Sequence, residues 1–172
     1  MMLSFRRASM TELRDDEHGS ALVEGAVLVP LLFALLFGVY EFSWFFYQQH
    51  VVSTGVRDAA RYLARVVNSC NAFSPAWASE EAYARNLATT GSITGGTARL
   101  RGWTAEMVTS HCTAIENPIG AGGLGLYRGG STIHVVTVST RFAEPALGFL
   151  ALLRLPPPII SISHSERVIG PG

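Results

Sequence analysis

One carboxylate, Glu24, stands at the N-terminal margin of a long apolar run in which residues 25–47 contain a single charge, Glu41. A carboxylate that enters a hydrocarbon layer without a partner costs free energy, so its placement needs an explanation. One explanation is that Glu24 stays at the membrane–water interface and reaches into water. The other is that it pairs with a partner inside the apolar layer.

A second candidate is the glycine-rich segment 120–125, which matches the dinucleotide-binding pattern Gly-x-Gly-x-x-Gly letter for letter. In that motif the glycines leave a strand and open a helix whose N-terminus holds a pyrophosphate. Here glycine-rich sequence continues to Gly130, and a strand is predicted to follow. The segment is therefore predicted to be a flexible loop, and no cofactor is expected.

Two cysteines, Cys70 and Cys112, lie in the part of the chain that follows the apolar run. An isolated pair in an exported domain most often forms a disulfide, and two unrelated buried thiols are the alternative. His111 adjoins Cys112, but no second pair of ligands follows at a zinc-like spacing, so no metal site is expected.

The five histidines do not show the spacing of a metal site or of an activated nucleophile. His134 and His164 fall in predicted strands that could become neighbours, where packing or hydrogen bonding to hydroxyls is favoured over metal binding. No Gly-x-Ser-x-Gly elbow is present, and we expect no enzymatic activity and no catalytic residues. The formal net charge of zero gives no long-range attraction to nucleic acid.

The apolar run is long enough for a transmembrane helix, which needs about 20 apolar residues at a rise of about 1.5 Å each. Tyr40, Trp44 and Tyr47 at its C-terminal end are typical of an interfacial aromatic belt. Pro30 removes a backbone donor and is expected to kink this helix.

Residues 48–68 are predicted to continue the helix, because apolar residues recur there at three- and four-residue steps. A second stripe consists of Arg57, Arg61 and Arg65. We slightly favour a solvated face with Asp58 as a local partner. A docking face for a neighbouring subunit or for lipid headgroups is the alternative. A continuous helix over 20–68 would be a rod of about 70 Å.

Beyond the long helix, the sequence predicts a small α+β head. A loop over 69–77 is followed by a helix that is capped by Ser79 and stops before Gly91. Strands are predicted over 105–114, 131–142 and 159–169, and connections of this length favour an antiparallel sheet of three strands. The second helix or the outer half of the long helix should cover the apolar face of this sheet.

The apolar stretch 145–158 between the last two predicted strands is too short and too interrupted to span a bilayer. Packing under the sheet is favoured. An exposed patch for a partner or for the membrane surface is the alternative.

The N-terminal part of the chain resembles a known family. A short polar leader that ends in Gly19, then four uncharged residues, Glu24 and an apolar helix resemble a prepilin peptidase site. The resemblance implies cleavage after Gly19, which would make Ser20 the new N-terminus and Glu24 the fifth mature residue. It also implies that Glu24 takes part in assembly. The stretches 21–24, 29–30, 37–42 and 58–62 resemble the TadE-like pseudopilins of tight-adherence (Flp) pilus systems, and the resemblance is strongest over residues 17–66.

This resemblance implies the general plan of pilins. The expected parts are a prepilin leader over 1–19, a transmembrane and extended helix over 20–68, and an exported α+β head over 69–172. The implied partners are a prepilin peptidase, other pilins or pseudopilins, the inner-membrane pilus assembly machinery and membrane lipid. The implied location is the bacterial inner membrane, with a single span, a cytoplasmic N-terminus and the head outside the cytoplasm.

In this chain Gly25 follows Glu24, whereas the major pilins of these systems have a sequence that resembles Glu-Tyr at this point. Together with the large C-terminal part, Gly25 favours a minor pseudopilin over the fibre subunit. The runner-up function is an uncleaved single-pass anchored protein whose head binds a ligand or an envelope partner. An anchored enzyme is the least favoured function, because no catalytic site is recognised.

Overall fold

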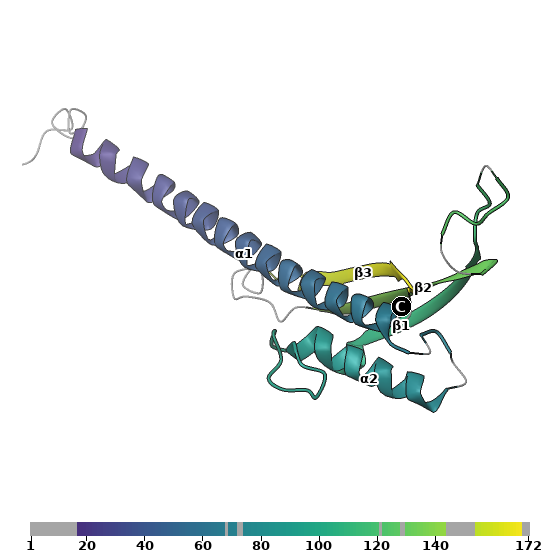
Figure 1. The fold of residues 1–172 in the computed structure, drawn as a ribbon. Coiled ribbons are helices and arrows are strands. Elements are labelled where there is room, and N and C mark those ends of the chain that lie inside the picture. The colour runs from purple at the N-terminus through teal and green to yellow at the C-terminus, as the bar shows by residue number, and fades with distance from the viewer. Residues whose placement is uncertain are drawn as a thin grey trace, which may run out of the picture. The chain divides into compact units, whose positions relative to one another are not determined.

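A computed structural model describes residues 17–67, 69–71, 74–120, 122–127, 130–143 and 154–169. Within these residues, two helices, one short 3-10 helix and three strands follow one another (Figure 1): α1 (Glu17–Arg65), α2 (Pro75–Thr90), η1 (Ala105–Met107), β1 (Val108–Glu116), β2 (Thr132–Ala143) and β3 (Ile159–Arg167). The predicted α+β class, with a long N-terminal apolar helix, one further helix and a three-stranded antiparallel sheet, is confirmed.

The chain divides into two compact units between Phe42 and Ser43. In the first unit α1 exposes large apolar side chains on all sides, from Leu22 to Tyr40. A helix that is apolar all round is typical of a membrane span. Among the described residues α1 alone is long and apolar enough to cross a membrane, and it runs through Pro30 without ending there.

The second unit contains the sheet, whose strand order is β1-β2-β3 with both pairs antiparallel. Val138 in the central strand pairs with Ser110 of β1 and with His164 of β3. Burial alternates along β2 from Val135 to Ala143, as expected for a sheet with one covered and one solvated face. On the more exposed face hydroxyls bond across the strands, with Thr109 to Ser139 at 2.9 Å.

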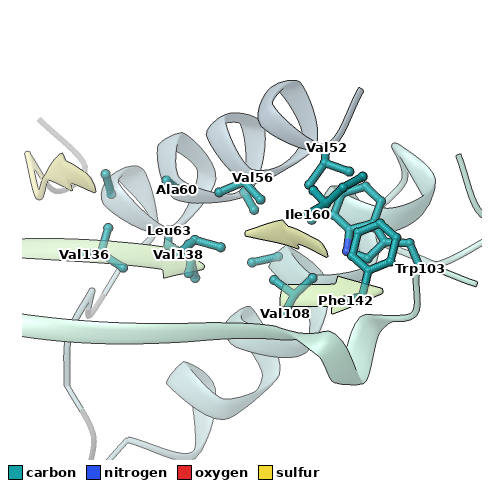
Figure 2. Packing of buried hydrophobic residues seen from close by; sticks show 14 of the residues in the cluster. Val52, Val56, Ala60, Leu63, Trp103, Val108, Val136, Val138, Phe142 and Ile160 are labelled. Carbon is teal, nitrogen blue, oxygen red and sulfur yellow. The ribbon is translucent and has the colours of Figure 1, made fainter. Parts of the chain in front are cut away.

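The C-terminal part of α1 covers the inner face of this sheet, as one of the two predicted alternatives requires. Figure 2 shows the apolar side chains of this helix directed toward those of the strands and toward Trp103. The second helix also contributes to the same core. The fully buried side chains at this junction are Val52, Val56, Leu63, Trp103, Val108, Val136, Val138 and Ile160.

Trp103 is the largest fully buried side chain among the described residues, and it contacts the sheet through both its ring and its N–H group. Its ring stacks on Phe142 with the centroids 6.1 Å apart. Its Nε1 donates a hydrogen bond of 3.0 Å to Oγ1 of Thr140, which in turn donates to the Met107 carbonyl at 2.9 Å. The buried indole N–H is therefore satisfied, as the low polarity of the core requires.

At Gly55, α1 lies very close to α2 and to Trp103. A Cβ at this position would lie 2.3 Å from the carbonyl oxygen of Ala88 in α2 and 2.8 Å from the ring of Trp103. Only a residue without a side chain allows the helix backbones to approach this far. The packing of the head therefore depends on a glycine at position 55.

Several predicted boundaries were wrong; the third strand, for example, ends at Arg167 and not at 169. The second helix begins at Pro75 with Ser74 as its N-cap residue, and not at Ser79, because the first turn of a helix needs no N–H from proline. The first strand starts at Val108, since 105–107 form a 3-10 turn. The long helix ends at Arg65, not at 68. The predicted C-terminus of α2 is confirmed, because Gly91 adopts a left-handed conformation (φ 81°) there.

Parts of two expectations fall outside the described residues. Residues 1–16 of the proposed leader and residues 144–153, which include most of the apolar stretch 145–158, are not described.

Candidate functional site

The residues of the proposed processing site lie at the beginning of α1. Gly19, Ser20 and Glu24 are all helical and exposed. A four-residue spacing places Ser20 and Glu24 on one face of the helix, about one turn apart. A free amine at Ser20 would therefore stand about one turn from the Glu24 carboxylate, at the start of a segment that is otherwise apolar.

The predicted disulfide is present between Cys70 and Cys112. It joins the connection between α1 and α2 to the middle of β1, and both cysteines pack against the apolar core. Cys70 has a positive φ of 63°, so the chain turns sharply at the point where it is attached. The bond therefore fixes the end of the long helix to the sheet.

His134 and His164 do not pair in the sheet. His164 lies opposite Val138, four positions along β2 from His134. Nε2 of His164 instead lies 3.0 Å from Oε1 of Glu166. No cluster of three or more His, Cys, Asp or Glu residues that could hold a metal ion occurs in the part of the chain that the structure describes.

The arginine stripe of α1 is exposed, as a solvated face predicts. Nε of Arg61 lies 3.7 Å from the Glu166 carboxylate. The expectation of Asp58 as a local partner was wrong, since its carboxylate is 3.4 Å from Nη2 of Arg99. This longer-range ion pair connects α1 to the segment after α2.

The glycine-rich segment forms part of the connection between β1 and β2, and the prediction of a loop is confirmed. An isolated bridge pairs Ile119 with Gly125 in antiparallel fashion. The next described element is the strand β2, so the helix N-terminus that a pyrophosphate would need does not follow the glycines here.

The sequence analysis missed the organising residue of this loop, Asn117, whose side chain is 7% exposed. Its Nδ2 donates to the carbonyl of Tyr127 at 2.8 Å and to that of Gly130 at 3.1 Å. Its Oδ1 accepts from the Tyr127 N–H at 3.2 Å. The dipeptide Asn117–Pro118 is a turn signal that could have drawn attention to this position.

A hollow of about 460 Å³ lies beside this loop. Its walls are mixed in polarity and come from the ends of β1 and β2 and from the glycine-rich segment. The lining residues are Glu116, Asn117, Ile119, Gly123, Gly125, Gly130, Ser131 and Thr132.

Comparison with known proteins adds one match. Residues 19–61 match the family model of TadE-like proteins, a segment that begins at Gly19 and contains Ser20 and Glu24. This match confirms the family resemblance over that segment and associates the chain with tight-adherence pilus systems. Its apolar helix is consistent with a membrane-anchored component of such a system. No curated protein and no solved structure matches the chain significantly.

Proposed function

We propose that this protein is a minor pseudopilin that takes part in assembly of a tight-adherence (Flp-type) pilus after a prepilin peptidase removes residues 1–19. The proposal rests mainly on one observation. The segment that matches TadE-like proteins starts at Gly19, and Glu24 follows five positions later at the beginning of the apolar helix. Cleavage before the apolar segment leaves the membrane anchor attached to the head.

The proposed role of Glu24 follows from the cost of a charge in an apolar layer. Within a bundle of helices the carboxylate of Glu24 in one subunit would meet the free amine of Ser20 in the next. Each charge would then neutralise the other in surroundings where an unpaired charge is strongly unfavourable. The pairing would also set the register between adjacent helices, because Glu24 and Ser20 provide the opposite charges at this end of the span.

The proposed location is the bacterial inner membrane with the head outside the cytoplasm. The disulfide Cys70–Cys112 supports this topology, since disulfides persist in oxidising compartments and are rare in the cytosol. Arg6, Arg7 and Arg14 precede the apolar helix and favour a cytoplasmic N-terminus. The partners would be a prepilin peptidase, other pilins or pseudopilins, and the inner-membrane assembly machinery.

Replacing Glu24 by alanine is expected to leave the protein inserted in the membrane but to impair pilus assembly. Alanine removes the charge that selects the neighbouring amine, and it makes the helix more apolar. Insertion is measured by resistance to alkaline extraction, and assembly by the amount of pilus sheared from producing cells. Glu106→Ala, which removes an exposed carboxylate from the head, serves as the matched control. Wild-type piliation with Glu24→Ala would contradict the role of Glu24.

A further inference from the structure

The connection between β1 and β2 holds three large apolar side chains in solvent. Ile119, Leu124 and Leu126 are 75%, 80% and 63% exposed, and together they are called the apolar prong here. Figure 1 shows this connection extending beyond the end of the sheet. Burial of such side chains is normally favourable by about 1.5–3 kcal/mol each, so their joint exposure calls for a reason.

Hydrogen bonds within the loop hold the prong in place. The N–H of Leu126 donates to the Pro118 carbonyl at 2.7 Å, and the N–H of Gly120 donates to the Leu124 carbonyl at 2.9 Å. Asn117 ties the base of the loop together through its side chain. A Cβ at Gly125 would lie 2.5 Å from Nδ2 of Asn117, so glycine is needed for this closure.

The base of the loop is also attached to the third strand. The guanidinium of Arg167 in β3 stacks over the ring of Tyr127, with its carbon 4.9 Å from the ring centroid. A loop with this many fixed points loses little conformational entropy when it binds, and preorganisation of this kind strengthens binding. These contacts therefore anchor the prong at its base.

We propose that the apolar prong docks into an apolar pocket of another protein of the pilus assembly machinery, which rests on the proposed function above. The hollow beside the prong shares Ile119 as a wall, and Glu116 is another of its lining residues. It can receive a polar or cationic side chain from the rim of the same pocket. An apolar anchor with an adjacent polar contact is the usual composition of a compact protein–protein contact.

Charge argues against a lipid surface as the occupant. Residues 116–131 contain one acid, Glu116, and one base, Arg128, so the segment has no net charge. Anionic membrane surfaces attract clusters of basic residues, and this segment has no such cluster.

The size of the prong argues against a stable dimer of this chain. Three aliphatic side chains bury apolar surface on the order of 300 Å². Stable interfaces bury roughly 800 Å² on each partner. An area this small fits a transient contact in which an anchor enters a pocket of a different protein, and it does not fit the extended interface of a stable dimer.

The first experiment measures piliation with the full-length double variant Leu124→Asn/Leu126→Asn in the producing bacterium. We expect at least a tenfold decrease in sheared pilus, while the thermal unfolding midpoint of the purified protein in detergent stays unchanged. Ile93→Asn removes a comparably apolar exposed side chain from another loop of the head and should leave piliation unchanged. Wild-type piliation in the double variant would overturn the inference.

A strain that lacks the gene separates this inference from the proposed function. Loss of piliation in that strain together with normal piliation in the double variant refutes the prong alone. Normal piliation in the strain that lacks the gene refutes both.

A photo-crosslinking amino acid at Leu124 identifies the occupant in cells that assemble pili. We expect one discrete adduct whose second component is another protein of the pilus machinery, and its yield should fall at least fivefold with Leu126→Asn. The same crosslinker at Ile93 should not form this adduct. Adducts with lipid only, adducts with a second copy of this chain only, or no adduct would each overturn the inference.

Discussion

Gly55→Ala is expected to lower the free energy of unfolding of the head by about 2–3 kcal/mol. The added methyl group would lie 2.3 Å from the Ala88 carbonyl oxygen and 2.8 Å from the Trp103 ring. Neither neighbour can move away without a considerable cost in free energy. The carbonyl belongs to the backbone of α2, and Trp103 is 1% exposed and bonded to Thr140.

The sign of this effect distinguishes packing from helix propensity. Glycine to alanine in a helix interior is by itself stabilising by up to about 1 kcal/mol. Gly38→Ala is the matched control, because Gly38 lies in the same helix and an added Cβ meets nothing within 4 Å. Urea unfolding of the full-length protein in detergent, followed by tryptophan fluorescence, gives both values. A Gly55→Ala protein as stable as wild type would show that the helices do not pack this closely.

Removal of the disulfide, by Cys70→Ala with Cys112→Ala, is expected to cost about 4 kcal/mol of stability. The two cysteines are 42 positions apart. A cross-link over a loop of this length restricts the unfolded chain by about that amount in the chain-entropy model. The enclosed segment includes the whole of α2, so the loss should also loosen the attachment of α2 to the core.

The same unfolding measurement tests the disulfide, and reduction provides an internal control. A reducing agent should lower the stability of the wild-type protein to that of the double variant and should not change the variant. A difference of less than about 1 kcal/mol between oxidised and reduced wild-type protein would contradict the predicted contribution. Strong dependence on the bond would mean that the head reaches full stability only in an oxidising compartment.

Much of the fold could be predicted from local sequence patterns. The apolar run predicts α1, and the richness of residues 131–142 in Val, Ile and Thr predicts β2 within one residue at each end. Errors occurred where a local rule had an exception. Pro75 suggested a loop, but proline is well suited to the first turn of a helix, and it opens α2.

The candidate site likewise contains some features that could be predicted from the sequence and some that could not. Gly19, Ser20 and Glu24 are close in sequence, so their spacing is visible without a structure. The contact of Asp58 with Arg99 joins residues 41 positions apart, and it could not be predicted from helical spacing. The close approach at Gly55 and the role of Asn117 also depend on partners that lie together only in the folded chain.

The most direct test of the proposed function is the N-terminal sequence of the mature protein, produced with and without its cognate prepilin peptidase. We predict a start at Ser20 that depends on the peptidase, which would place Glu24 at the fifth position of an assembling subunit. A start at Met1 or Met2 in the presence of an active peptidase would contradict processing. The protein would then be an anchored head whose function lies in what it binds.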